Sequence, residues 1–289
     1  MTGTPRDPAF QASSPQARPT RDLHTRAAAC TLALLPAVVA CAWSGHDWTP
    51  AIISVPAALP LLQDHARNRG SEGSDSERFF QQMLLLSLWM RTDALAARIG
   101  AMLALFVIDL ALRRRDAANP FHPVMVACAL ALLVFPASPP ERVLSEGAVP
   151  LAATIAAGGA VLLALRCVRW QAPVAMLACA VVAFALGSIV VPAWLGDPAL
   201  LATFPSFALT AFFIVDDPPR ACMRPRARLL SGALTGVVAM AATFGLHALH
   251  RDGQFLLLAL AGTMLLANAA APALDRLFSV SRAAGKAGA

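Results

Sequence analysis

Charged residues are scarce in this 289-residue chain, and their scarcity excludes an ordinary soluble domain. Asp, Glu, Lys and Arg make up 14% of the sequence, hydrophobic residues make up 57%, and the mean hydropathy is +0.61. A water-soluble domain of this length usually has about a quarter of its residues charged. We therefore predict an all-α polytopic membrane protein that is embedded in membrane lipid.

Sequence motifs that carry chemistry are also missing. The chain has no Cys-x-x-Cys pair, and its six cysteines lie in or beside apolar segments without a His close enough to complete a metal site. We interpret these cysteines as small packing residues and expect no metal centre. A hydrolytic triad, a phosphate-binding glycine loop and an iron–sulfur cysteine set are absent as well. Any redox chemistry must therefore use a bound organic cofactor or partner subunits.

Apolar segments recur along the whole chain, and about ten of them are long enough to be candidate transmembrane helices. They are Ala27–Trp43, Trp48–Leu62, Phe79–Met90, Ala97–Leu112, Pro120–Pro136, Leu151–Leu165, Ala172–Val191, Pro198–Val215, Leu229–Leu249 and Phe255–Leu274. The second candidate contains Pro50, Pro56 and Pro60 and the third is short, so half-helices or broken helices are expected there. We predict a disordered cytoplasmic tail at 1–26, a transmembrane domain at 27–278 and a second cytoplasmic tail at 279–289.

Basic residues give the expected orientation, because Lys and Arg concentrate in cytoplasmic loops. With ten crossings and the N-terminus inside, only Arg91, Arg98, Arg142 and Arg251 of the 23 basic residues fall outside, which leaves 23 − 4 = 19 inside. We therefore predict that both termini are cytoplasmic and that the loop at 137–150 is external. The net charge of +6 follows from this topology and requires no nucleic-acid partner.

The last quarter of the chain resembles a known family. Asp217-Pro218, Asn268, Pro272 and Asp275-Arg276 match its pattern, while Asp216 stands where the family has Thr. This pattern is similar to the RnfD/NqrB family, the membrane subunit of Rnf electron-transport complexes and of sodium-pumping NADH:quinone reductases. The resemblance implies two inverted five-helix repeats, a bacterial inner (plasma) membrane location, flavin cofactors and other Rnf/Nqr-type subunits as partners.

A second motif, Asn119-Pro-Phe-His122-Pro123, opens the fifth candidate span. It resembles the family's Asn-x-Phe-Asn-Pro-Ala, with His122 where Asn is usual. Backbone N–H groups at such a helix start can face a phosphate or a carbonyl. Simple capping of a helix that begins with proline would explain the same residues.

The segment from Ser145 to Leu151 resembles the family's Ser-Gly-Ala-Thr-Pro-Leu, whose Thr carries flavin mononucleotide (FMN) through a phosphoester bond. Here Gly147, Ala148 and Val149 align with that motif, and Val149 takes the place of the acceptor Thr. Valine has no hydroxyl, and the additional Glu146 puts a negative charge where a phosphate would lie. Ser145 and Thr154 are nearby hydroxyls, but neither has the local pattern of the motif. We predict no covalent FMN at Val149, and FMN or riboflavin would have to bind non-covalently.

Asp217 and Asn268 complete the set of candidate cofactor-binding residues. A carboxylate at the mouth of a membrane domain can attract a cation or accept a proton, or it can lie in a solvated turn neutralised by neighbouring arginines. Asn268 is deep in the tenth span and should face other helices, because hydrocarbon offers an amide no hydrogen bonds. The spacing Gly232-x-x-x-Gly236 is typical of close helix contact.

Two functions remain open at this point. One is a divergent RnfD/NqrB-like subunit of an electron-transfer, ion-translocating complex, which would make it part of an oxidoreductase (translocase). The other is a non-redox paralogue that acts as a small-molecule transporter or as a scaffold subunit of another membrane complex. Val149 favours the second, whereas the motif from Asn268 to Arg276 indicates common descent only.

Overall fold

Every regular element in the described part of the chain is helical. The computed structural model describes residues 20–44, 48–52, 75–90, 95–113, 121–135, 141–217, 221–250 and 253–287. In chain order the elements are α1 (Thr20–Ser44), α3 (Asp75–Trp89), α4 (Leu95–Arg113), α5 (Pro123–Val134), α6 (Glu141–Ala164), α7 (Gln171–Val190), η3 (Pro192–Gly196), α8 (Pro198–Leu201), α9 (Phe204–Leu209), η4 (Thr210–Ile214), α10 (Pro225–His250) and α11 (Gly253–Ala287). The predicted all-α class is confirmed.

Three helices are long and apolar enough to cross a membrane: α7 over Gln171–Val190, α10 over Pro225–Leu249 and α11 over Phe255–Phe278. Shorter apolar helical segments, at Ala29–Trp43, Pro123–Val134, Ala148–Ala164 and Phe204–Ile214, accompany them. Large apolar side chains on the surface of these helices, such as Val190 and Leu266, are exposed, as expected where lipid is the solvent. A membrane protein with several crossings is supported, while the count of ten and the inverted repeats stay predictions.

The eighth predicted span, Pro198–Val215, is wrong as a single helix. The chain forms α8, turns at Ala202 and Thr203, and continues through α9 into η4, a π-helical turn in which Val215 N–H donates to Thr210 O at 2.8 Å. Pro205 explains part of this break, because it has no N–H to continue the hydrogen bonds of α8. The other break, expected within Trp48–Leu62, lies mostly outside the described residues.

Several predicted boundaries shift. Helix α1 begins at Thr20 and α11 continues to Ala287, so helical structure extends into both segments that were predicted as tails. Helix α6 begins at Glu141, and the predicted external loop at 137–150 is therefore helical over its last ten residues. Hydrophobic periodicity does not detect such extensions, because polar helical turns outside an apolar span carry no apolar signal.

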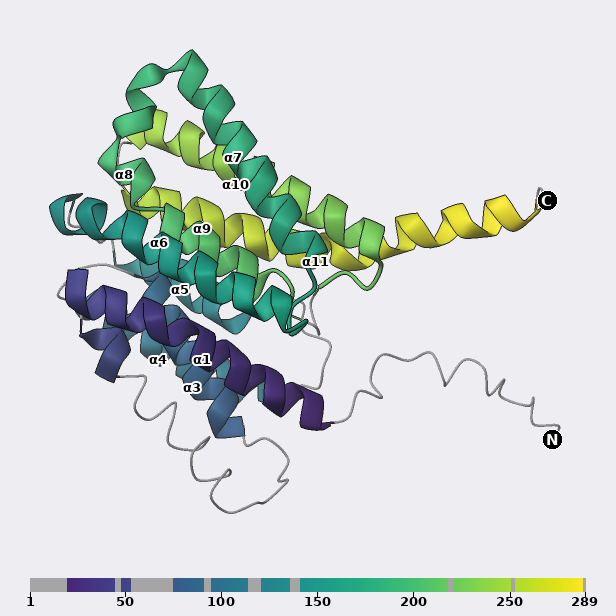
Figure 1. Ribbon diagram of the computed structural model, residues 1–289, viewed down its shortest axis with the longest axis horizontal. Helices are drawn as coiled ribbons and strands as arrows, with labels where there is room; N and C mark the ends of the chain where they lie inside the picture. Colours follow the sequence, from purple (N-terminus) through teal and green to yellow (C-terminus); the bar gives the residue numbers. More distant parts are fainter. Residues whose placement is uncertain are drawn as a thin grey trace.

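Small residues set the closest helix contacts. Helices α7 and α10 lie side by side (Figure 1), and a Cβ at Gly232 or Gly236 would meet the backbone oxygen of Ala172 or Met176 on α7. Gly158 on α6 meets the backbone of Ala33 on α1 in the same way. The packing role predicted for Gly232 and Gly236 is confirmed, because only a missing side chain lets the two backbones approach this closely.

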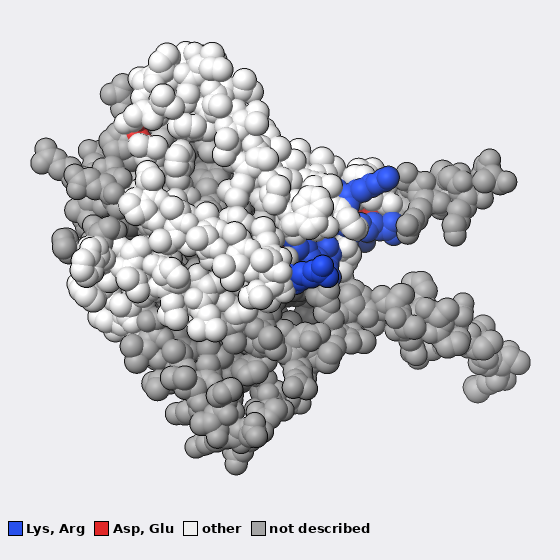
Figure 2. All heavy atoms as spheres, viewed as in Figure 1, with Lys and Arg blue, Asp and Glu red and all other residues white. Residues whose placement is uncertain are grey.

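Helix α1 begins at the same end of the bundle at which α11 ends (Figure 1). An even number of crossings follows for the chain between these two points. Lys and Arg side chains gather at this end, where α10 begins and α11 leaves the bundle (Figure 2). We call it the arginine-rich end; its described arginines are Arg166, Arg169, Arg224, Arg226, Arg228 and Arg276.

Candidate functional site at the arginine-rich end

His122 lies directly before α5 at the arginine-rich end and is 4% exposed. Its backbone carbonyl accepts a hydrogen bond from Val126 N–H at 3.1 Å and so starts the helix, while its side chain makes no capping hydrogen bond. The imidazole Nε2 instead lies 3.9 Å from Oδ2 of Asp217. The two predicted site residues are therefore neighbours, and the capping explanation does not account for the His122 side chain.

Asp216 and Asp217 face different partners although they are adjacent in sequence. The carboxylate of Asp216 is buried, and its Oδ2 accepts a hydrogen bond from the backbone N–H of Arg169 at 2.8 Å. Arg169 lies in the turn between α6 and α7, in which Arg166 adopts a positive φ of 57°. Asp216 thus fixes this turn to the end of η4, while the carboxylate of Asp217 is left to face His122. The solvated-turn explanation is wrong for Asp216, because that side chain is 4% exposed.

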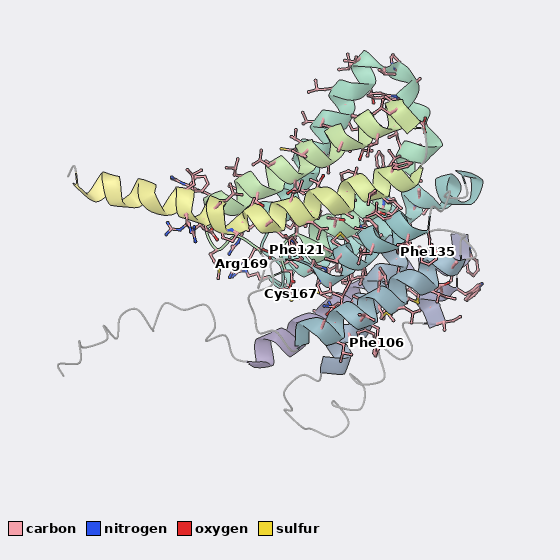
Figure 3. The ribbon with its side chains drawn as sticks, turned by 180° about the vertical axis from the view of Figure 1, so that it is seen from behind. Phe106, Phe121, Phe135, Cys167 and Arg169 are labelled. Atoms are coloured by element: carbon pink, nitrogen blue, oxygen red, sulfur yellow. The ribbon has the colours of Figure 1, made fainter. Side chains whose placement is uncertain are left out.

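Figure 3 shows Phe121, Cys167 and Arg169 close to one another at the arginine-rich end, whereas Phe135, just after α5, lies at the opposite end. Three connections therefore meet at one place: the start of α5, the α6–α7 turn and the end of η4. Sequence reasoning placed His122 and Asp217 in one candidate set but missed the α6–α7 turn. No local motif marks that turn, since its contribution is a backbone N–H.

Asp275 forms a second polar centre at this end. Its carboxylate accepts hydrogen bonds from Met223 N–H at 2.7 Å and from Arg224 N–H at 3.1 Å. Helix α10 begins at Pro225 with no Ser, Thr, Asp or Asn immediately before it, so its first N–H groups need an acceptor from elsewhere. The family pattern included Asp275 without a role; the missing local cap was the signal that could have indicated one.

Arg228 and Cys222 pack beneath this carboxylate. The Arg228 guanidinium donates to the backbone oxygens of Cys222 at 2.6 Å and Met223 at 2.7 Å, which holds the turn before α10 from its other side. Burial and the nearby negative charge of Asp275 raise the pKa of the Cys222 thiol to about 11. Cys222 therefore stays a neutral thiol at physiological pH, in agreement with its interpretation as a packing residue.

Asn268 is 6% exposed and lies on α11, which packs against α5 and α10. Its predicted burial between helices is confirmed. Within the described part of the chain, the Nδ2 amide of Asn268 has no hydrogen-bond partner. A buried amide donor without an acceptor is unfavourable by about 1–3 kcal/mol, so this atom is a point at which a ligand carbonyl or phosphate oxygen would be stabilised.

Gly147, Ala148 and Val149 lie in the first half of α6, away from His122. Gly159, further along the same helix, meets the Phe212 ring in η4, and Val149 lies ten residues before it, about 15 Å along the axis. Ala148 is fully buried, whereas Val149 is 58% exposed. The Thr154 hydroxyl donates to Leu151 O at 2.9 Å within its own helix. Asn119 and the Ser145 side chain lie outside the described residues.

These features define a class: a multi-pass all-α membrane protein with polar contacts gathered at one end of its helices. Residues 143–283 match the profile of the NQR2, RnfD, RnfE family. Through this segment, just under half of its length, the chain is related to that family, and the resemblance expected from the sequence is confirmed. The matched segment includes Asp217, Asn268 and Asp275 and excludes His122.

Curated relatives are named as the D subunit of an ion-translocating oxidoreductase complex. The relative from Tolumonas auensis is 37% identical over 130 residues, which cover 45% of this chain and 34% of the relative. The relative from Escherichia fergusonii is 36% identical over 120 residues, covering 41% and 32%. That from Salmonella paratyphi B is 37% identical over 119 residues, covering 41% and 31%. The alignments thus span about a third of the length of each of these relatives.

Proposed function

We propose that the chain is a divergent RnfD/NqrB-like integral membrane subunit of an electron-transfer, ion-translocating complex. The observation that carries the proposal is the family match over residues 143–283, which retains Asp217, Asn268 and Asp275. In this proposal the subunit lies in the bacterial inner membrane and works with other Rnf/Nqr-type subunits, as the relatives' names describe for those proteins.

We further propose that the arginine-rich end faces the cytoplasm, so that both termini are cytoplasmic. The arginines at the start of α10 and at the end of α11 support this orientation, because Lys and Arg are retained on the cytoplasmic side during insertion. The start of α5 and the Asp217 carboxylate would then be accessible from the cytoplasm.

Covalent flavin does not fit this chain at Val149. The valine has no hydroxyl, its neighbour Glu146 is acidic, and the nearby Thr154 hydroxyl is bonded within α6. Non-covalent FMN or riboflavin fits the arginine-rich end better, because Asn268 offers a buried donor and His122 a buried imidazole. His122 and Asp217 would hold a polar edge of the ring and Asn268 a carbonyl oxygen. A bound flavin supplies electron transfer in one- and two-electron steps.

Flavin titration tests this assignment. Protein purified in mild detergent should quench the fluorescence of added riboflavin or FMN in a saturable way, and His122→Ala and Asn268→Ala should each weaken the apparent affinity about tenfold or more, the size expected for one lost buried hydrogen bond. His247→Ala, at the opposite end, is the matched control and should leave the affinity unchanged. An absence of saturable quenching in the wild-type protein would contradict non-covalent flavin binding.

Restoring the acceptor tests the covalent chemistry. Wild-type protein co-expressed with a flavin transferase should carry no in-gel flavin fluorescence. Deleting Glu146 and introducing Val149→Thr rebuilds the Ser-Gly-Ala-Thr-Pro-Leu sequence, and this double variant should become fluorescent. Fluorescence of the wild-type band would refute the prediction for this chain and direct peptide mapping to Ser145.

The second candidate function is a non-redox paralogue that transports a small molecule or supports another membrane complex. The exposed Val149, in place of a hydroxyl-bearing acceptor, is the observation that favours it. Colourless protein without saturable flavin quenching would favour this candidate. Co-purification of other Rnf-type subunits with the tagged chain would favour the first.

A further inference from the structure

A second histidine–carboxylate pair lies at the end of the bundle opposite the arginines. His247 on α10 is 7% exposed, and its Nε2 lies 3.0 Å from Oδ2 of Asp197 in the connection between η3 and α8. This separation is a hydrogen-bonding distance, unlike the 3.9 Å between His122 and Asp217. The other oxygen of Asp197, Oδ1, faces Leu200 N–H at 3.4 Å. The carboxylate is thus fixed between the start of α8 and the imidazole.

The geometry determines which imidazole nitrogen carries the proton. An ionised carboxylate only accepts hydrogen bonds, so Nε2 must be the protonated nitrogen facing Asp197. In the neutral imidazole the lone pair then resides on Nδ1. This atom is buried and has no hydrogen-bond partner within the described part of the chain. The pair therefore contains a buried basic nitrogen whose conjugate acid would have a carboxylate beside it.

The surroundings leave Asp197 as the charge that decides the protonation of His247. Helix α7 carries no acidic or basic residue, and Cys179 is its one titratable side chain. The charged residues of α11, Asp275, Arg276, Arg282 and Lys286, all lie in its last half, toward the arginine-rich end. On α10 itself, Arg226 and Arg228 are in the first turns.

Aromatic rings exclude water on one side of the pair. The indole of Trp194 in η3 stacks on Phe244, one helical turn before His247, with 4.4 Å between centroids and 15° between planes. Phe184 on α7 extends this stack, with 6.0 Å between its centroid and that of Phe244. The position of η3 is thereby tied to α10 twice, through the stacked rings and through the His247–Asp197 contact.

We propose that His247 and Asp197 form a proton-binding site at the end of the bundle opposite the arginines. A proton from bulk water adds to Nδ1, and the resulting imidazolium is stabilised by the Asp197 carboxylate. This site is separate from the proposed flavin-binding end, so failure of one proposal leaves the other standing.

Nitrogen NMR of 15N-histidine-labelled protein in lipid nanodiscs, titrated from roughly pH 5 to pH 9, tests the site. His247→Gln identifies the His247 signals by their loss. At high pH the neutral ring should carry its proton on Nε2, and on acidification Nδ1 should become protonated. Asp197→Asn keeps an acceptor oxygen for Leu200 but removes the charge, and it should weaken proton binding about tenfold, a downward shift of about one pH unit in the midpoint. His122 is the matched control and should not respond to this substitution.

Three results would overturn the proposal: an Nδ1–H tautomer at high pH, no titration of His247 over this range, or an unchanged midpoint in Asp197→Asn. The tautomer and the titration are read in the wild-type protein, so they decide the question even if Asp197→Asn fails to fold. Thermal unfolding of each variant in the same nanodiscs separates a lost charge from a lost fold.

Discussion

The carboxylate of Asp275 accepts a hydrogen bond from the backbone N–H of Met223 at 2.7 Å and so connects the last turns of the α11 span to the turn before α10. Its second oxygen accepts from Arg224 N–H, and the Arg224 guanidinium in return donates to Phe278 O at 2.9 Å. Helices α10 and α11 are thus joined at the arginine-rich end by bonds that neither helix could form alone. This explains physically why an Asp at this position fits the family pattern.

Removing this acceptor should loosen the turn before α10. Asp275→Ala leaves the N–H groups of Met223 and Arg224 without their partner and should lower the unfolding free energy by about 1–3 kcal/mol. Asp275→Asn keeps one acceptor oxygen and should have a smaller effect. Thermal unfolding in detergent and trypsin cleavage at Arg224 measure both effects. Equal stability of the wild type and Asp275→Ala would contradict this role.

The reactivity of Cys222 should report on the same carboxylate. Burial, and secondarily Asp275, raise the pKa of Cys222 to about 11, so Asp275→Asn should lower that pKa and speed alkylation by iodoacetamide at pH 9. A hydrogen bond from Ser231 lowers the pKa, so Ser231→Ala should slow alkylation, the opposite direction. Peptide mass spectrometry follows the Cys222 peptide, with the Cys167 peptide as an internal control. Parallel changes in the two variants would exclude this account.

The same shift makes stability depend on pH in the alkaline range. The folded pKa of Cys222, about 11, lies above the ordinary thiol value of 9.0, so the folded state holds the thiol proton more tightly than the unfolded state. Its contribution to stability is therefore fully present below pH 9 and is lost between about pH 9 and pH 11. Cys222→Ser should flatten the stability profile in this window, and a profile identical to wild type would contradict the linkage.

Helix contact at Gly236 should tolerate no side chain. A Cβ there meets the backbone of Met176, so Gly236→Ala should force α7 and α10 apart and destabilise the protein by about 1–3 kcal/mol. Gly245 lies on the same helix, a Cβ added there would meet nothing within 4 Å, and Gly245→Ala should not destabilise. The thermal midpoint of the detergent-solubilised protein measures the difference. A loss of stability in both variants would indicate general sensitivity of α10 instead.

The hydrogen bond between α3 and η4 should contribute to stability. Trp89 Nε1 donates to Thr210 Oγ1 at 3.1 Å, and both side chains are fully buried. Thr210→Val removes this bond with little change of shape and should cost about 0.6 to 1.7 kcal/mol, the range for bonds between membrane helices. Thr235→Val is the matched control, because the Thr235 hydroxyl donates within its own helix to Ser231 O at 2.7 Å. Equal losses in the two variants would show that the contact between helices adds nothing.

The proposed orientation can be tested by reporter fusions. Truncated fusions after Arg115 and after Ser145 should place the reporter on opposite sides of the membrane, because α5 crosses between them. The pair to compare is an alkaline phosphatase fusion, active outside, and a fluorescent protein fusion, active inside. The same side for both positions would exclude the proposed crossing by α5 and the ten-span topology.

Composition alone determined that this is an all-α membrane protein, because a chain with so little charge and so many apolar segments must satisfy its backbone within helices. Sequence spacing also predicted the contact at Gly232 and Gly236, because residues four apart lie on one helix face. His122 and Asp217 were chosen through the family resemblance, and that resemblance alone gave no distance between them. The α6–α7 turn and the broken eighth segment were missed, since a backbone N–H and a π-helical turn leave little mark on side-chain pattern.

Tertiary structure decided the partners. Asp216 and Asp217 are adjacent in sequence, yet the fold directs the first to the backbone of Arg169 and the second to His122. Asp275 reaches Met223 from more than fifty residues away, and His247 reaches Asp197 in the same manner. Hydrophobicity is a property of each residue and can be read locally, whereas a hydrogen bond needs a donor and an acceptor that only the packed helices bring within about 3 Å of each other.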